Sequence, residues 1–166
     1  MAKMAVQGRE PGRSVGVLAC FVAICLAVGA IGGWVTRPAL DAWYPALAKP
    51  WFTPPDWVFA PVWTALYVAM GAAAWLAWRS PERIRVQDAL YLFAIQLGLN
   101  LGWSLLFFGT RAIGLALADI LALWLAIAAT TRAFWHLDRR SGLLMLPYLA
   151  WVSYAALLNG AIWWMN

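Results

Sequence analysis

Residues 43–67 read WYPALAKPWFTPPDWVFAPVWTALY and lead directly into an apolar segment. This stretch holds four tryptophans and five prolines in 25 residues. Proline removes a backbone donor and fixes φ, so it constrains the path of the chain, whereas tryptophan supplies a large, flat apolar surface. Together they predict a shaped aromatic surface at the mouth of a membrane-embedded helix.

The chain around this stretch has the composition of an integral membrane protein. Of its 166 residues, 64% are hydrophobic and 11% are charged, whereas about 25% are charged in soluble globular domains. A helix that crosses a bilayer needs roughly 20 apolar residues. Five segments meet this need, at 15–35, 57–78, 89–109, 112–131 and 143–165. We therefore expect an all-α membrane protein, a single domain over 1–166 formed by a bundle of five transmembrane helices.

The basic residues predict how the bundle is oriented. Three of them, Arg37, Lys49 and Arg111, fall on one side of the five-helix arrangement, and the other nine fall on the opposite side: Lys3, Arg9, Arg13, Arg79, Arg83, Arg85, Arg132, Arg139 and Arg140. The positive-inside rule then places the N-terminus in the cytoplasm. Because these residues sit at helix ends rather than in one patch, we do not expect nucleic-acid binding.

The first apolar segment has a second interpretation. Residues 1–30 resemble a signal peptide, with a basic start and an apolar run that ends in small residues. The run is longer than the roughly 7–15 residues of a signal core, so we expect the first helix to be retained.

The first connection, 36–56, is 21 residues long. A loop of this length in a compact protein is a candidate functional element. Its end predicts a helix start, with Thr53 as the cap and Pro54 at the first helical position. The fourth connection, 132–142, is charged and contains His136, the single histidine of the chain.

Three of the predicted helices carry a stripe of aromatic or amide side chains at about 100° per residue. The stripes are Phe59, Trp63, Leu66, Tyr67 and Met70; Gln96, Asn100, Trp103 and Phe107; and Tyr148, Trp151, Ala155 and Leu158, with Asn159 less central. Amides that face lipid would be unpaired, so they should face the bundle interior. Two interpretations stay open: interhelical packing with amide cross-links, or a pocket for a flat, largely apolar ligand.

Small residues mark further helix faces. Gly98 and Gly102 form a G-x-x-x-G pair opposite the amide stripe, and Gly29 and Gly33 form another. Such pairs suit close helix contact, either a dimer seam or a contact within the bundle. Asp119 is the single charged residue in the five apolar segments, which makes it a functional candidate.

Ordinary enzyme chemistry finds no support in the sequence. No cluster of His, Cys, Asp and Glu has metal-ligand spacing, and no serine has an evident histidine partner. Cys20 and Cys25 lie within the first apolar segment, where we expect buried free thiols. We therefore expect no metal site and no acid–base catalysis.

Three motifs occur in a fixed order: the stretch at 43–67, QLGLNLGWSLLFFG at 96–109, and PYLAWVSYAALLN at 147–159. In combination they resemble the tryptophan-rich sensory protein/translocator protein family, also called the peripheral-type benzodiazepine receptor family, from about residue 30 onward. The resemblance implies a five-helix bundle with a cavity that opens toward the first loop, so we expect the loop at 36–56 to cover this cavity as a lid. It also implies a homodimer in a bacterial cell membrane, and binding of porphyrins, haem-related tetrapyrroles and benzodiazepine or isoquinoline ligands, with no obligatory cofactor.

Carried over residue by residue, the resemblance assigns ligand contacts to Tyr44, Phe59, Ala60, Val62, Trp63, Gln96, Asn100, Phe107, Trp151, Ala155 and Leu158. We expect a receptor or sensor. A light-dependent porphyrin-degrading enzyme is an alternative, because tryptophans that match Trp63 and Trp151 are implicated in porphyrin breakdown in some bacterial members. A transporter of porphyrins or other lipophilic molecules is another. Animal members carry a sterol-associated Tyr followed by Lys or Arg, but no basic residue follows Tyr154, which argues against sterol binding by that route.

Overall fold

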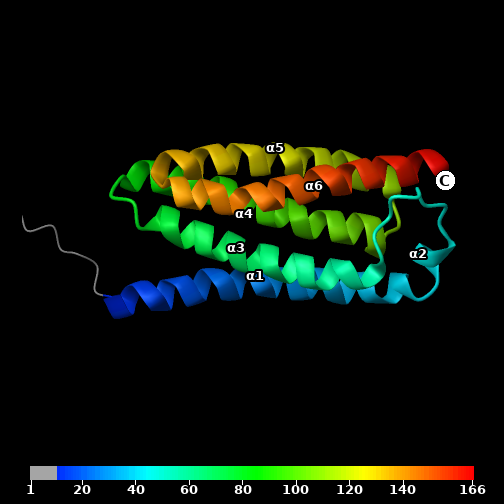
Figure 1. Ribbon diagram of the computed structural model, residues 1–166, viewed down its shortest axis with the longest axis horizontal. Coiled ribbons are helices and arrows are strands. Elements are labelled where there is room, and N and C mark those ends of the chain that lie inside the picture. Colours follow the sequence, from blue (N-terminus) through cyan, green and yellow to red (C-terminus); the bar gives the residue numbers. More distant parts are fainter. Residues whose placement is uncertain (1–10) are drawn as a thin grey trace, which may run out of the picture.

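The computed structural model describes residues 11–166, with side chains from Ser14 onward, as a bundle of long helices (Figure 1). Five helical runs are long and apolar enough to cross a membrane: Ser14–Leu40, Asp56–Trp78, Arg83–Gly109, Ile113–Leu137 and Arg139–Met165. No strand occurs within the described residues. The expected all-α membrane fold with five spanning helices is confirmed. Of the basic residues used for orientation, Lys3 and Arg9 lie outside the described residues.

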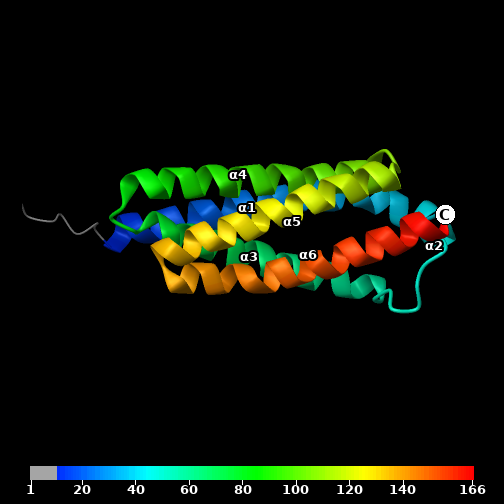
Figure 2. The same ribbon diagram turned by 90° about the horizontal axis from the view of Figure 1, so that it is seen from above.

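The long helices run side by side along the length of the molecule (Figures 1 and 2). They are α1 (Pro11–Leu40), α3 (Phe59–Trp78), α4 (Arg83–Ser104), α5 (Ile113–Leu137) and α6 (Arg139–Met165). Three short elements complete the chain: α2 (Trp43–Ala46), the 3₁₀ turn η1 (Asp56–Val58) and the π-helical turn η2 (Leu105–Gly109). The helix α2 and the C-terminal end of α6 lie at the same end of the bundle, which we call the loop end.

Several helices extend beyond the apolar segments from which they were predicted. The helix α1 continues to Leu40, so the first connection narrows to residues 41–55, which we call the lid. The expected charged loop at 132–142 reduces to Asp138, whose carboxylate accepts the backbone N–H of Arg140 at 2.7 Å. His136 therefore lies in the last turn of α5 rather than in a loop. Hydropathy marks the part of a helix that is apolar, whereas charged residues with good helix propensity continue the helix past it.

The predicted helix start at Thr53 is wrong. The Thr53 hydroxyl donates to the Pro50 carbonyl at 2.8 Å, and the chain becomes helical only at Asp56. Pro55 is extended, with φ −58° and ψ 142°. A residue that precedes proline is disfavoured in the helical region, so the second proline keeps Pro54 out of the helix.

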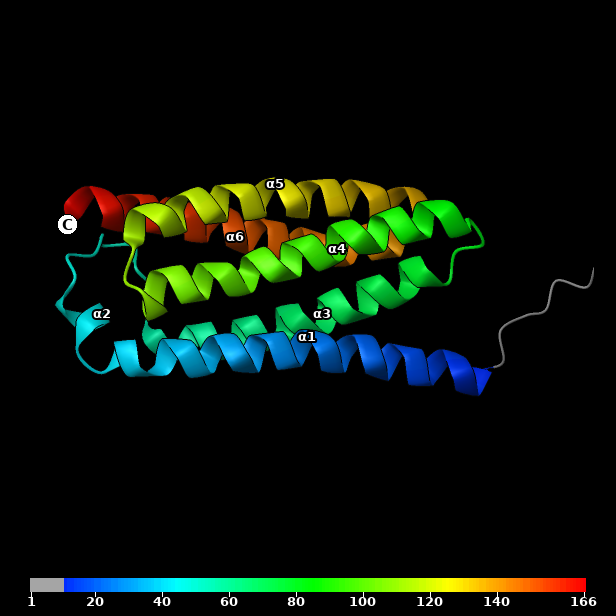
Figure 3. The ribbon, with the colours of Figure 1, turned by 180° about the vertical axis from the view of Figure 1, so that it is seen from behind.

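The core is formed mainly by α3, α4, α5 and α6, and α1 packs against its side. Among residues 14–40, Cys25, Gly32 and Ala39 are the buried positions. In two opposite views α1 runs along α3 (Figures 1 and 3). A Cβ at Gly71 would lie 2.6 Å from the Val22 backbone, so this glycine allows the two helices to approach closely.

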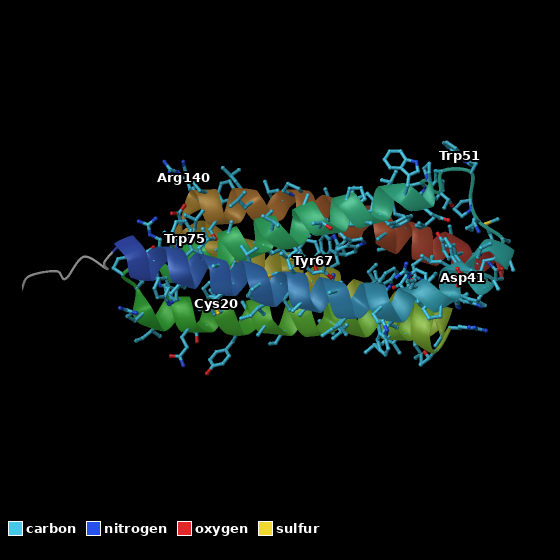
Figure 4. The ribbon with its side chains drawn as sticks, turned by 90° about the horizontal axis from the view of Figure 1, so that it is seen from below. Cys20, Asp41, Trp51, Tyr67, Trp75 and Arg140 are labelled. Carbon is cyan, nitrogen blue, oxygen red and sulfur yellow. The ribbon has the colours of Figure 1, made fainter. Side chains whose placement is uncertain are left out.

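A hydrogen bond fixes the other end of the α1–α3 contact. The indole N–H of Trp75 donates to the Ser14 carbonyl at 2.8 Å, near the end of the bundle opposite the lid (Figure 4). Between this bond and the lid, α1 and α3 enclose part of the cavity described next.

Candidate functional site

A cavity of about 450 Å³ lies between α1, α3 and α4 and extends from mid-bundle to the lid. Tyr67 marks its inner part near mid-length, whereas Asp41 and Trp51 lie at the loop end (Figure 4). The side chains that line it come from four parts of the chain: Leu26, Gly29, Ala30, Gly32, Gly33, Thr36, Arg37 and Leu40 of α1; Tyr44 and Asp56; Phe59, Ala60, Trp63, Thr64 and Tyr67 of α3; and Asn100, Trp103, Ser104 and Phe108.

The inner part of the cavity ends on a buried polar network. The Tyr67 hydroxyl donates to the Asn100 side-chain carbonyl at 2.5 Å, and the Asn100 amide donates to the Tyr148 hydroxyl at 3.0 Å. Asn100 and Tyr148 are 2% and 0% exposed, so most of the network is buried. Because three helices contribute one side chain each, the network fixes α3, α4 and α6 relative to one another.

Stacked aromatic rings stiffen the wall formed by α3. The Trp63 ring stacks on Tyr67 with centroids 5.6 Å apart and meets Tyr148 edge-on at 6.1 Å. A ring held on two sides keeps one rotamer, so Trp63 presents a fixed flat surface to the cavity.

A π-helical turn shapes the wall formed by the end of α4. In η2 the backbone N–H of Thr110 bonds to the Leu105 carbonyl at 2.8 Å, one residue further back than in an α-helix. Phe107 is buried, whereas its neighbour Phe108 lines the cavity. Trp103 stacks on Phe107 at 5.3 Å and donates its indole N–H to Asn159 at 3.0 Å. Adjacent phenylalanines of this turn thus lie in two different environments.

The lid reaches the cavity through Tyr44, which is 4% exposed and meets Phe107 and Phe108 at 6.4 and 5.7 Å. Lys49 donates to the Tyr44 carbonyl at 2.8 Å, and its ammonium lies 4.7 Å from the Tyr44 ring centre. Burial, together with the charges of Asp56 and Tyr154, raises the pKa of Tyr44 to about 12. The Tyr44 hydroxyl is therefore neutral at physiological pH.

The lid is attached to the end of α6. The Tyr154 hydroxyl donates to the Phe52 carbonyl at 2.5 Å. The Asn166 side chain accepts from the backbone N–H of Ala48 and donates to its carbonyl, both at 3.0 Å. These bonds join residues that are more than 100 positions apart in sequence, so the lid is held by the far end of the chain.

The structure brings five of the eleven predicted ligand contacts to the cavity: Tyr44, Phe59, Ala60, Trp63 and Asn100. The other six are not among its lining residues. Phe107 and Leu158 are buried together with Tyr44, and Val62 and Ala155 pack against the main core. Trp151 meets Phe59 edge-on at 6.0 Å, and Gln96 is 0% exposed in the interior.

Two of these six side chains have buried polar atoms that the described residues leave unpaired. The nitrogen and the oxygen of the Gln96 amide have no hydrogen-bond partner, and the indole nitrogen of Trp151 has none either. Buried polar groups are normally paired. These buried atoms therefore keep unused hydrogen-bonding capacity within the described residues.

The wall formed by α1 was not predicted. Eight residues of α1 line the cavity, yet α1 is apolar on every side and has no stripe that distinguishes one face. The Gly29/Gly33 pair was the available signal. A Cβ at Gly29 would collide with the Tyr67 ring, whereas a Cβ at Gly33 would meet nothing within 4 Å. Small residues on α1 thus create the space rather than fill it.

The Gly98/Gly102 pair does not form one continuous contact. A Cβ at Gly102 would lie 3.2 Å from a carboxylate oxygen of Asp119, so Gly102 packs against α5. A Cβ at Gly98 would meet nothing within 4 Å. One carboxylate oxygen of Asp119 is buried without a partner, and Asp119 does not line the cavity. Within residues 14–166, no group of three or more His, Cys, Asp and Glu side chains is arranged to hold a metal ion.

Comparison with known protein families and sequences identifies chains that are similar to this one. The TspO/MBR family profile matches residues 21–165. The tryptophan-rich protein TspO of Chlorobaculum tepidum is 43% identical over 90% of this chain and 95% of its own length. The tryptophan-rich sensory protein of Cereibacter sphaeroides is 41% identical over 84% of each chain, and the human translocator protein 42% over 73% of each.

Proposed function

The chain belongs to the TspO/MBR family of membrane proteins, and from this premise we propose that it is a receptor for flat, largely apolar ligands. The proposed ligands are tetrapyrroles such as protoporphyrin and haem-related molecules, together with benzodiazepine- and isoquinoline-type compounds. They bind in the cavity between α1, α3 and α4, under the lid.

The observation that carries this proposal is the aromatic lining of the cavity. Trp63 and Tyr67 from α3, Trp103 from α4 and Phe108 from η2 present ring surfaces to one space of about 450 Å³. Small-molecule sites typically have volumes of about 300–1,000 Å³, apolar walls and a few polar groups that fix orientation. Here Asn100 and Ser104 supply neutral polar groups, and stacked rings supply the surface that a planar ligand needs.

The membrane setting follows from the same helices. We propose the bacterial cell membrane, with the N-terminus in the cytoplasm. Arg140 lies at one end of the bundle and the lid at the other (Figure 4), and the positive-inside rule assigns the arginine-rich end to the cytoplasm.

We also propose a homodimer. Gly98 supports it, because this exposed glycine leaves room for a close helix contact from outside.

A light-dependent porphyrin-degrading enzyme is a second candidate. The Trp63 indole lines the cavity, so an electron-rich ring would lie against a bound photosensitiser. Illumination of the protein with protoporphyrin should then give a new product over many turnovers, and none in darkness. Bleaching that stops at one equivalent would favour the receptor.

Filling the cavity tests the receptor proposal directly. Gly33→Leu adds a side chain where a Cβ meets nothing, so the protein should fold while the cavity loses volume. Gly16→Leu is the matched control, since Gly16 is on the same helix, is equally open and does not line the cavity. Protoporphyrin should quench tryptophan fluorescence saturably in the wild type and in Gly16→Leu. We expect at least about tenfold weaker binding in Gly33→Leu. Equal affinity in all three proteins would refute the cavity as the site.

A further inference from the structure

We propose that Arg37, in the last turn of α1, binds an anionic group of the ligand and so makes the cavity selective for flat apolar molecules that carry a carboxylate. This inference rests on the proposed ligand cavity and adds to it the chemical class that the cavity prefers. The residue was not among the ligand contacts that the sequence predicted.

The position of Arg37 is the first argument. Among the residues that line the cavity, it is the sole lysine or arginine. It is exposed and lies three residues before the end of α1 at Leu40. A long cationic side chain at the end of an apolar span extends its charged group to the membrane surface. A ligand could therefore place its rings among Trp63, Trp103 and Phe108 and its charged group where the membrane meets water.

The second argument is that Arg37 is unpaired. Within residues 14–166 its guanidinium makes no hydrogen bond or ion pair, and the ion pair found there joins Arg85 to Glu82. The other basic side chains at the loop end are engaged. Lys49 donates to two lid carbonyls, and the guanidinium of Arg111 lies 5.7 Å from the Trp43 ring centre. The guanidinium of Arg37 thus keeps its donors for a carboxylate, which it can bind with two parallel hydrogen bonds.

Two acidic residues oppose this attraction and orient the ligand. Asp56 lines the same cavity, and Asp41 lies one turn after Arg37. Neither carboxylate lies within 4.0 Å of the Arg37 guanidinium, so neither neutralises it by contact. A ligand carboxylate is attracted to Arg37 and repelled by Asp56, which selects one direction for a ligand with a charged edge.

The surface of the cavity supplies the third argument. On α1, Leu26, Ala30, Gly33 and Arg37 follow one another at helical spacing, and all of them line the cavity and are exposed. Opposite them on α3, Ala60 and Thr64 are also both lining and exposed. The cavity therefore opens between α1 and α3, along a strip that ends at Arg37. The small side chains of this strip leave room for a planar molecule to enter from the bilayer while its carboxylate stays at the surface.

Two probes that share one ring system and differ in their carboxyl groups test the inference: protoporphyrin IX, which carries two carboxylates, and its dimethyl ester. We expect the wild type to bind the diacid about fivefold more tightly than the ester, as fits a charge-assisted bond at a partly solvated site. Arg37→Gln should lose that preference by weakening diacid binding about fivefold, with ester binding unchanged. Arg37→Lys should retain part of the preference for the diacid, because lysine keeps the charge but cannot form two parallel hydrogen bonds to a carboxylate.

Two further variants serve as controls. Arg111→Gln removes an equal charge at the same end of the bundle from a residue that does not line the cavity, so it should leave both affinities unchanged. Asp56→Asn removes the opposing charge and should tighten diacid binding about twofold. Equal losses in Arg37→Gln and Arg111→Gln would overturn the inference, because they would indicate a general surface field.

The outcomes also separate this inference from the proposed function. If wild type and Arg37→Gln bind the diacid and the ester with one common affinity, the assignment of Arg37 is wrong while the receptor stands. If neither probe binds the wild type saturably, the receptor proposal fails, and the selectivity of Arg37 fails with it.

Discussion

The hydroxyl of Tyr67 on α3 donates a hydrogen bond of 2.5 Å to the side-chain carbonyl of Asn100 on α4. This bond lies where the cavity meets the core, since both residues line the cavity and Asn100 also donates to the fully buried Tyr148. One amide thus supports the inner wall of the site and joins three helices.

Replacing that amide should destabilise the bundle. Asn100→Leu leaves the hydroxyls of Tyr67 and Tyr148 without their partner in the interior, and we expect a loss of about 2 kcal/mol in the free energy of unfolding. Thermal unfolding in detergent measures it. Gln87→Leu is the control, because Gln87 is an exposed amide on the same helix. Similar melting of Asn100→Leu and wild type would show that the network does not hold the helices.

Removing the indole at position 63 should weaken ligand binding rather than folding. Trp63→Leu removes the flat surface that Tyr67 and Tyr148 hold in place, and we expect about fivefold weaker protoporphyrin binding. Trp164→Leu is the control, because it removes an indole that is 85% exposed and does not line the cavity. Titration by absorbance rather than fluorescence avoids the loss of a reporter. The wall assignment fails if the two variants bind alike.

The pKa of Tyr44 predicts how stability changes in alkali. Its pKa rises from 10.0 to about 12 on folding because of burial, with Asp56 and Tyr154 adding to the shift. The folded state therefore favours the neutral hydroxyl. The resulting stability is fully present below pH 10 and is lost as the pH rises from about 10 to about 12.

Absorbance of tyrosinate during alkaline titration tests this sign. Subtracting the curve of Tyr44→Phe from that of the wild type should isolate one group that titrates near pH 12. The variant should also lose less stability than the wild type between pH 10 and 12. A difference curve centred near pH 10 would show that Tyr44 is not buried by the lid in solution.

Loosening the attachment of the lid should speed ligand release. Tyr154→Phe removes the bond to the Phe52 carbonyl, so we expect dissociation of bound protoporphyrin to become about threefold faster with a small change in the association rate. Tyr91→Phe is the control, since it removes the hydroxyl of an exposed tyrosine on α4. Stopped-flow displacement measures the rate, and unchanged release from Tyr154→Phe would argue that ligands do not leave past the lid.

Two glycine substitutions should have different effects on the stability of the bundle. Gly71→Ala brings a methyl group within 2.6 Å of the Val22 backbone, which must move, and we expect a loss of about 2 kcal/mol. Gly16→Ala adds a methyl group into open space and should be neutral or stabilising by up to about 1 kcal/mol. Thermal unfolding of the two variants in one detergent compares them. Equal stability would mean that α1 and α3 are not in close contact.

Much of this structure could be read from the sequence, and the exceptions have physical reasons. Hydropathy located five spans, but it reports where a helix is apolar and not where it ends, so α1 and α5 continue through charged residues. The amides of Gln96 and Asn100 were expected in the interior, and both are buried. One helical turn separates them, yet Asn100 alone reaches the cavity. A stripe fixes the face of a helix but not the depth of each side chain behind that face.

The wall contributed by α1 shows a different limit. A helix that is apolar on all sides has no pattern to indicate which residues face the protein, so Arg37 read as an orientation charge and Gly33 as a packing motif. Their role depends on which neighbour α1 contacts, and that is decided by the close approach of Gly71 to Val22, one helical turn from the lining residues Tyr67 and Leu26.

The π-helical turn at Leu105–Gly109 has a consequence for how this cavity can vary. It holds one more residue than an α-helical turn, and it carries both the buried Phe107 and the cavity-lining Phe108. A point substitution alters one ring, but a single-residue deletion would rotate everything after it by about 100°. A deletion or insertion of one residue in this turn would therefore change the binding surface more than a substitution would.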